Sequence, residues 1–459
     1  MTANRRRRTK WQGGSDRSVT GFLHNPAVET RDPAEQAARD AARYPEQIAY
    51  LLEKSDFYRA KLAEAGISRV ADAGGLDAIA NLPFTEKDEL RKSQADHPPL
   101  GSHVAASWDE IVRVYSTSGT SGDPCYIAIT PADLDVWTEI SARSYAACGI
   151  HRGRRVVHNY GAGPFVAAAA TDMLTRNRIA HIPVGTGNTE RYIASIRKMG
   201  ATAIMATPSF ALYLIDWLEE RGIAPRSLGI ARMAVAGEPG GGDPVIRSRI
   251  ETAFGCTANE AMGIGDISIT LWGECEDQGG MHFSGRDFVH VELIDPESGA
   301  ALPFEDGAEG ELVYTALRRE AMPLLRFRSR DHVVVNARPC ACGRTSVRVR
   351  CIGRTDDMLI VRGVNLFPSA LRAVVNRFAP HVGEVVMIRP RTRGVMQEPP
   401  LPVAIELAAG AEPPPDLAER IRAAIRSELI VAAEIELVPH LSLPRSEYKS
   451  RLVDFGKAG

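Results

Sequence analysis

The sequence YSTSGTSGDP, residues 115–124, is the stretch around which the chain is best understood. Ser, Thr and Gly fill every position from 116 to 122, and short alternating apolar segments lie on either side, at 112–114 and 126–130. Glycine lets the backbone turn sharply close to a ligand, successive backbone N–H groups in a turn bind anions, and hydroxyl groups add further donors. The pattern favours a phosphate-binding turn between two strands. A simple polar hairpin turn is the alternative, and a Walker P-loop is excluded because no Gly-Lys-Ser/Thr follows.

The overall composition is that of an ordinary soluble globular protein. The chain has 459 residues, of which 44% are apolar and 24% charged, and its net charge is -2. This length accommodates two or three domains, and the charge balance gives no sign of nucleic-acid or membrane binding. No run approaches the roughly 18 apolar residues of a membrane span. Seven cysteines, an odd number, argue against a disulfide scaffold and favour a reducing cytoplasm.

Helix and strand signals divide the chain into regions. Basic residues at 5–8 and 10, with no apolar segment after them, predict a disordered basic tail over 1–32. Helices are expected near 33–66, 131–148, 165–176, 188–199 and 208–221, and strands at 156–159, 180–183, 203–206 and 231–235. Such alternation is typical of parallel sheets covered by helices. From about 285 the pattern changes to strands separated by Gly, Pro and Asp turns, at 289–294, 310–315 and 332–335.

The last hundred residues predict a separate, compact α+β unit. Its expected strands are 357–361, 384–388, 401–407 and 434–438, and its expected helices lie near 368–378 and 414–428. The predicted fold class is therefore α/β, with a large N-terminal α/β domain over 33–353 and a small C-terminal α+β domain over 354–459. The large domain combines parallel sheets covered by helices with a β-rich part.

Several later segments concentrate glycine or charge. They are Ala236–Gly242, Met262–Asp266, Arg326–Asp331, Gly353–Met358 and Pro444–Arg451. The first follows the strand expected at 231–235 and precedes a helix, so its glycines would let a flat ligand approach the edge where open α/β sheets bind ligands. Considered alone, any single Asp or Lys in these segments would be interpreted as a solvated surface charge.

Together, in this order and spacing, the segments resemble the adenylate-forming superfamily, and specifically the phenylacetate–coenzyme A ligase family. The resemblance covers residues 40 to 455 and includes segments less widely shared in the superfamily, at 187–191, 206–209 and 362–368. It implies ATP-dependent activation of an aromatic carboxylic acid as an acyl-adenylate, with release of pyrophosphate. The acyl group then passes to coenzyme A. It also implies that Mg²⁺ neutralises the phosphates and that the small domain moves between the two steps. Because dimers occur among relatives, a homodimer is a possible assembly.

The resemblance assigns a nucleotide-binding set. The phosphate loop comprises Ser118, Gly119, Thr120, Ser121 and Gly122, and the adenine-lining segment comprises Gly237, Glu238 and Pro239. Asp331 is expected to accept hydrogen bonds from both ribose hydroxyls, which suits an acceptor-only carboxylate. Arg354 is expected beside it, near ribose and phosphate.

The resemblance also assigns the catalytic residues. Lys449 is expected to bridge the substrate carboxylate and the α-phosphate, where charge builds up in the transition state; an exposed lysine near the C-terminus is the alternative. Thr120 and Asp266 complete the expected catalytic set, with Asp266 as the magnesium ligand. Asp356 is the expected hinge of the small domain. No protein nucleophile is needed, because the enzyme's contribution is positioning and electrostatics.

Three departures from the family pattern matter, and the last of them bears on the second step. Asp266 replaces the usual Glu, Met262 replaces an aromatic residue that stacks near adenine, and Tyr448 replaces the glycine before the lysine. Adenylation remains the expected chemistry. The acceptor could instead be a carrier protein or an amine, as in secondary metabolism, or the substrate a small inorganic acid such as nitrite. A non-catalytic nucleotide-binding homologue is a further alternative, which the presence of Lys449 and Asp331 disfavours.

Cysteine and histidine spacing indicates a metal site. Cys275 and His282 form a Cys-x6-His pair, and Cys340 and Cys342 follow in a Cys-x-Cys-Gly turn. Three thiolates and one imidazole could complete a tetrahedral structural zinc site. Buried free cysteines are the alternative, and Cys256 is an alternative ligand.

The acyl pocket implied by the resemblance has small apolar walls. Its expected residues are Tyr160, Gly161, Phe165, Thr207, Ala236, Met262, Gly263 and Ile264. A planar aryl ring would suit such walls because burying it removes apolar surface from water. A ring hydroxyl or amine could be recognised by polar residues nearby, namely His158, Tyr160, Asp172 and Thr207.

Overall fold

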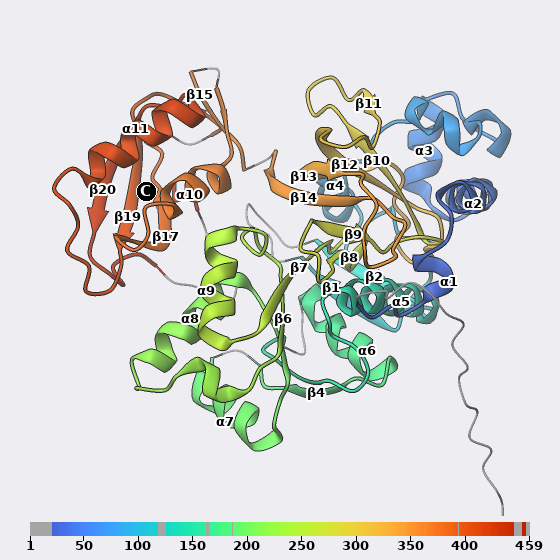
Figure 1. Cartoon of the computed structure of the whole chain (residues 1–459). Coiled ribbons are helices and arrows are strands. Elements are labelled where there is room, and N and C mark those ends of the chain that lie inside the picture. Colours follow the sequence, from blue (N-terminus) through green and yellow to red (C-terminus); the bar gives the residue numbers. More distant parts are fainter. Residues whose placement is uncertain are drawn as a thin grey trace, which may run out of the picture.

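The structure is a computed structural model that describes residues 21–117, 125–161, 165–185, 187–355, 357–362, 364–392, 394–444 and 452–455. It has a large N-terminal part and a small C-terminal part, coloured orange to red in Figure 1. Within the described residues, no helix is long and apolar enough to cross a membrane.

A twelve-stranded sheet forms the centre of the large part, in the order β11-β10-β12-β13-β14-β9-β8-β7-β6-β5-β3-β4. Its parallel half comprises β3 (Arg155–His158), β4 (Ala180–Pro183), β5 (Ala203–Ala206), β6 (Arg232–Ala236) and β7 (Thr257–Ile264). Its antiparallel half comprises β8 (Ser268–Glu274), β9 (Met281–Phe283), β10 (Val289–Ile294), β11 (Ala301–Leu302), β12 (Glu309–Ala316), β13 (Phe327–Asn336) and β14 (Arg348–Arg354). Strand β7 lies parallel to β6 and antiparallel to β8, so it joins the two halves.

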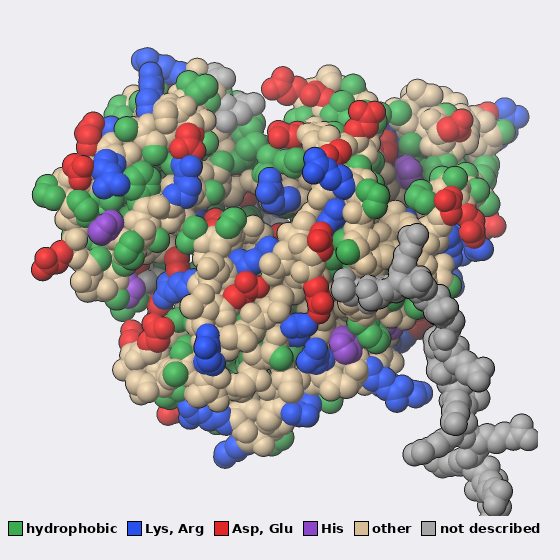
Figure 2. All heavy atoms as spheres, in the orientation of Figure 1, with side chains coloured by type: hydrophobic (Ala, Val, Ile, Leu, Met, Phe, Trp, Pro, Cys, Tyr) green, Lys and Arg blue, Asp and Glu red, His purple; other side chains and the backbone are tan. Residues whose placement is uncertain are grey.

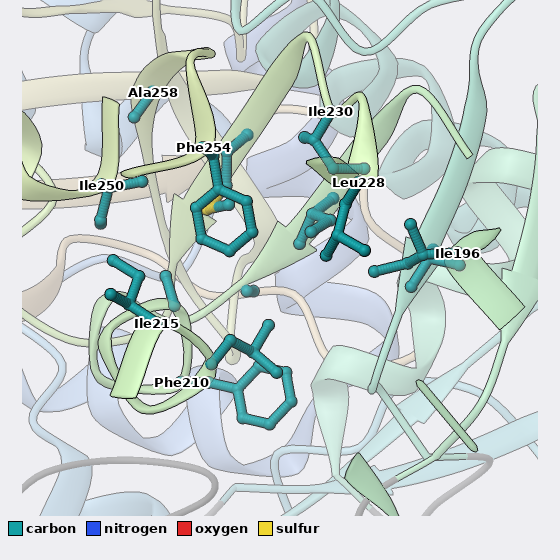
Figure 3. Packing of buried hydrophobic residues seen from close by; sticks show 14 of the residues in the cluster. Ile196, Phe210, Ile215, Leu228, Ile230, Ile250, Phe254 and Ala258 are labelled. Carbon is teal, nitrogen blue, oxygen red and sulfur yellow. The ribbon is translucent and has the colours of Figure 1, made fainter. Parts of the chain in front are cut away.

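Helices cover both faces of the parallel half, as predicted. One face carries α7 (Thr189–Met199), α8 (Pro208–Glu219) and α9 (Pro244–Phe254), and the other carries α5 (Pro131–Ala147) and α6 (Ala169–Arg176). Neighbouring strand residues alternate between the two cores: Val157 packs with α7 and α8, while Val156 packs with α5 and α6. Figure 3 shows the first of these cores.

Side-chain caps explain where the covering helices begin. Thr207 follows β5 and accepts a hydrogen bond from the backbone N–H of Phe210, and Asp243 accepts from Val245 and Ile246. Proline stands in the first turn of both helices, where its missing N–H costs nothing. The caps therefore fix the sites at which chain leaving the sheet turns into α8 and α9.

The N-terminal helices pack against the antiparallel half. They are α1 (Pro26–Glu29), α2 (Pro33–Lys54), α3 (Asp56–Glu64) and α4 (Lys87–Asp96), with the short 3-10 helices η1 (Val70–Ala73) and η2 (Leu76–Asn81) between α3 and α4. Two further 3-10 helices, η3 (Val166–Ala168) and η4 (Pro225–Leu228), lie later in the chain. The predicted disordered tail over 1–32 is wrong at residues 26–29, which form α1, while residues 1–20 lie outside the described part of the chain. The Glu29 carboxylate accepts a 2.9 Å hydrogen bond from buried Arg344, and the Glu29 carbonyl accepts one from the Thr345 N–H.

The strand pair predicted around the Ser/Thr/Gly stretch is confirmed. β1 (Arg113–Ser116) and β2 (Tyr126–Ile129) pair antiparallel, with Ser116 opposite Tyr126. The Thr117 N–H also donates to the Cys125 carbonyl at 2.9 Å. The two ends of the intervening segment are thus held side by side.

The C-terminal part consists of two three-stranded sheets and two helices. The sheets comprise β15 (Leu359–Val361), β16 (Val364–Leu366) and β18 (Met396–Gln397), and β17 (Val382–Ile388), β19 (Leu401–Leu407) and β20 (Ala433–Val438). Helices α10 (Pro368–Asn376) and α11 (Leu417–Leu429) pack on them around one apolar core. This is the compact α+β unit that the sequence predicts.

The small part contacts the large part beside α9. Buried Arg372 on α10 donates a 2.9 Å hydrogen bond to the Pro239 carbonyl, and Asn376 contacts Asp243 at 3.4 Å. An ion pair joins Arg249 to Glu384. On the visible face, acidic and basic side chains are interspersed over both parts (Figure 2).

Candidate active site

A cavity of about 260 Å³ opens at the carboxyl ends of the parallel strands. Its walls include Tyr160 after β3, Thr207 after β5 and Ala236 at the end of β6. Open α/β sheets bind ligands at this edge. The antiparallel half adds residues from β13 and β14, so both halves of the sheet contribute to one site.

The residues expected to bind adenosine gather on this cavity. Gly237, Glu238, Pro239, Asp331 and Arg354 all line it. Antiparallel pairing of β13 with β14 sets Asp331 opposite Arg354, and their side chains approach to 3.3 Å. Glu238 accepts a 2.7 Å hydrogen bond from the backbone N–H of Ser209, and Gly237 has a φ of 95°, a conformation that favours glycine. The Asp331 carboxylate and the Arg354 guanidinium thus line the same cavity as a turn whose backbone a ligand can approach closely.

Most residues expected in the acyl pocket also line the cavity. They are Tyr160, Phe165, Thr207, Ala236, Met262 and Gly263, whereas Gly161 and Ile264 lie outside the lining. A Cβ atom on Gly263 would approach the Ile269 carbonyl oxygen to 2.2 Å, so only glycine fits where β7 and β8 converge. The walls are completed by small apolar side chains, among them Ala167, Ala170 and Ala261.

Asp266 occupies a different position from the adenosine set. It is buried beside Lys87 of α4, with 2.5 Å between the carboxylate and the ammonium nitrogen, and it does not line the main cavity. It borders a small hollow with His103 and Cys125. Burial lowers the pKa of His103 to about 4, so its imidazole is neutral. No motif in the sequence indicates that Lys87 is the partner of Asp266.

Glu260 and Tyr145 line the cavity but were not singled out from the sequence. Glu260 lies on β7, a strand that the sequence reading missed, and Tyr145 lies on α5 among core residues. Burial, with repulsion from Glu274, raises the pKa of Glu260 to about 7. Its burial beside the cavity marks Glu260 as a candidate functional residue, and no motif in the sequence indicates that burial.

Other predicted residues fall outside the described part of the chain. They are Ser118, Gly119, Thr120, Ser121, Gly122, Asp356 and Lys449. Ser116 and Thr117, which precede the first of these segments, line the cavity. After the last segment, Leu452 and Asp454 form backbone hydrogen bonds of 2.8 Å with Ile388 in the small part.

The four predicted metal ligands come together in one cluster. The ligand atoms of Cys275, His282, Cys340 and Cys342 all lie within 4.8 Å of one another. Cys275 follows β8, His282 lies on β9, and the turn at 340–343 lies over them. The Nδ1 atom of His282 lies 3.2 Å from the Ser346 carbonyl, which leaves Nε2, 3.3 Å from the Cys342 sulfur, to face the cluster. Hydrogen bonds from Cys275 and His282 lower the pKa of Cys342, favouring its thiolate.

Comparison with known proteins agrees with this arrangement. Residues 363–454 match the family described as AMP-binding enzyme C-terminal domain. A phenylacetate-coenzyme A ligase of Thermus thermophilus is 34% identical over 454 residues, covering 93% of this chain and 97% of that protein.

Solved structures of 2-hydroxyisobutyryl-CoA ligase are similar over nearly the whole chain. The complex with R3-HIB-AMP in the postadenylation state has a TM-score of 0.86 at 28% identity, covering 97% of this chain and 94% of that one. The complex with 2-HIB-AMP and CoA in the thioesterification state has a TM-score of 0.69 at 30% identity, covering 94% and 91%. The two parts of this chain are therefore arranged more like the postadenylation state.

Proposed function

We infer the function from one premise: the chain belongs to the phenylacetate–coenzyme A ligase family of adenylate-forming enzymes. We propose that it activates an aromatic carboxylic acid with ATP, releases pyrophosphate, and transfers the acyl group from the adenylate to coenzyme A. The observation that carries the proposal is a single cavity bounded by the 237–239 turn, the Asp331–Arg354 pair and a small-residue apolar wall. It offers adjacent places for an adenosine and a planar acyl group.

In the first step, the chain's task is to orient a carboxylate against the α-phosphate and to stabilise the charge that develops. Asp331 would accept from the ribose hydroxyls, and Lys449 would stabilise the transferring group. Ser118 to Gly122 would hold the phosphates, whose charge Mg²⁺ would neutralise. Asp266 is the carboxylate suited to that cation, and its ion pair with Lys87 would have to open before it could bind one.

In the second step, the small domain would turn about Asp356 to admit the thiol. The solved structures of the similar 2-hydroxyisobutyryl-CoA ligase in both a postadenylation and a thioesterification state support this movement. We propose that the boundary between the two domains lies between residues 353 and 354. Because Tyr448 stands where the family has glycine, a carrier protein or an amine is retained as an alternative acceptor.

We also propose that the cysteine–histidine cluster binds zinc in a structural role. Three sulfurs and one imidazole nitrogen match the donors and the number of ligands in tetrahedral zinc sites, and they leave no open position for substrate. Thiolate ligands require reduced cysteines, in keeping with a cytoplasmic location.

A second candidate substrate is a short hydroxy acid. The solved structures with the higher similarity hold adenylates of hydroxyisobutyric acids. The same cavity could accept such an acid without change to the nucleotide set.

Acid-dependent ATP–pyrophosphate exchange tests the proposal. The panel comprises benzoates, phenylacetates, cinnamates, their hydroxy and amino derivatives, short hydroxy acids and nitrite, each with and without coenzyme A. Exchange that Lys449→Ala abolishes, with a thioester formed when coenzyme A is added, is the expected result. Exchange without thioester would move the protein to another acceptor. Absence of exchange with every acid would refute the proposal.

A further inference from the structure

Two tyrosine side chains interrupt the apolar wall of the cavity. Tyr145 on α5 and Tyr160 after β3 both line it, and they are only 3% and 7% exposed. Their side chains share a hydrogen bond. Since α5 and β3 are separate elements, the pair is created by the packing of the helix on the sheet.

The surroundings of the pair are apolar. The neighbouring wall consists of Ala167, Ala170, Ala261 and Ile269, and Tyr145 belongs to the apolar core between α5, α6 and the sheet. Burying a hydroxyl group in such surroundings costs free energy unless it is hydrogen-bonded. Phenylalanine at position 145 would fill the same wall with no polar atom. The hydroxyl is therefore a feature that packing alone does not require.

A pair of hydroxyl groups can both donate and accept, because each carries one proton and two lone pairs and can rotate. It therefore matches a neutral group with the same capacity, namely a hydroxyl or an amino group. It does not match a carboxylate, which needs donors alone. Burial also raises the pKa of Tyr145 well above its usual value, so that side chain stays neutral.

We propose that Tyr145 and Tyr160 determine acid specificity by hydrogen-bonding a hydroxyl or amino group on the acyl portion of the substrate. This inference rests on the proposed function and narrows its substrate class to hydroxy- or amino-substituted acids. A site built to hydrogen-bond such a group rejects an analogue without it, because the buried hydroxyls then lose a partner.

The test compares acids that differ only by hydroxyl and methyl. The aryl pairs are 4-hydroxybenzoate with 4-methylbenzoate and 4-hydroxyphenylacetate with 4-methylphenylacetate; the aliphatic pair is 2-hydroxyisobutyrate with pivalate. For at least one pair, the wild-type protein should favour the hydroxy acid by about tenfold or more in kcat/KM of pyrophosphate exchange. Tyr145→Phe should reduce that preference to less than about threefold while exchange with the methyl acid is retained.

A matched control is Tyr192→Phe. Tyr192 is equally buried, and its hydroxyl contacts the Val157 carbonyl at 3.4 Å, but it does not line the cavity. This variant should keep the wild-type preference. A wild-type preference near one for every pair, or an unchanged preference in Tyr145→Phe, would overturn the inference while leaving the proposed function intact.

A direct measurement of acid binding distinguishes failure of the proposed function from failure of this inference. If no acid supports exchange, the proposed function fails, and calorimetric titration with the same acid pairs still tests the tyrosines. Tighter binding of one hydroxy acid that Tyr145→Phe removes would support the inference. Equal binding of both members of every pair would overturn it.

Discussion

Replacing Glu260 by glutamine should make the protein more resistant to unfolding at alkaline pH. Burial and the neighbouring Glu274 raise the pKa of Glu260 from 4.5 to about 7 in the folded protein. Between these values the folded state keeps a proton that the unfolded state releases, so stability falls as pH rises. Above pH 7 the folded protein holds a buried carboxylate. At roughly 1.4 kcal/mol per pH unit, the difference between the unfolded and folded pKa values corresponds to a loss of about 3 kcal/mol in the free energy of unfolding.

Urea unfolding at pH 5 and pH 8 measures this effect. The gain in unfolding free energy of Glu260→Gln over wild type should be about 2–3 kcal/mol larger at pH 8 than at pH 5. Glu64→Gln, which neutralises an exposed carboxylate on α3, controls for net charge. Glu274→Gln removes the repulsion and should shrink the pH dependence of the wild type. If the gain of Glu260→Gln differs by less than about 0.5 kcal/mol between the two pH values, the account of its burial is refuted.

Further substitutions test the fold and the site. Asp133→Ala should cost about 3–5 kcal/mol in urea unfolding, because buried Asp133 faces the buried Arg319 guanidinium and accepts three backbone hydrogen bonds; a loss below about 1 kcal/mol would contradict this. Cys342→Ser should reduce the zinc content measured by elemental analysis, whereas equal zinc in wild type and variant would exclude the cluster. Asp331→Ala should raise KM for ATP by about tenfold or more, and an unchanged KM would remove it from the ribose site. Arg372→Ala should increase protease cleavage between the two parts, and an unchanged cleavage pattern would show that the contact with Pro239 does not hold them together.

The parallel half of the fold was predictable because its signals are local. Strands 180–183 and 203–206 were predicted with the bounds observed, and helix starts such as that of α8 are marked by a capping residue followed by proline. Strand β13 was only partly predicted. Its buried residues alternate with charged ones such as Arg328 and Arg330, which pair with Glu86 and Glu311, so the strand resembles a polar segment in the sequence.

The candidate site was predictable only as far as its motifs. The resemblance identified Asp331 and Arg354. Their placement opposite each other depends on the register between β13 and β14, which no short motif predicts. Tyr145 has the spacing of a core residue on a helix, and only the packing of α5 on the sheet turns it toward the cavity. The cysteine–histidine cluster was predicted residue by residue because cysteine is rare and its spacing is informative.

The contact between α1 and the turn after β13 has a consequence for biosynthesis. Glu29 is among the first residues that the structure describes, and its partners Arg344 and Thr345 lie more than three hundred positions later. Synthesis proceeds from the N-terminus, so α1 leaves the ribosome long before the residues that hold it exist. The Arg286 contact with the Val28 carbonyl can form earlier, but the contacts with Arg344 and Thr345 must wait until nearly the whole large domain has been translated. A chain interrupted before residue 344 would lack these partners, so α1 would be held by fewer contacts and would be more accessible to chaperones and proteases.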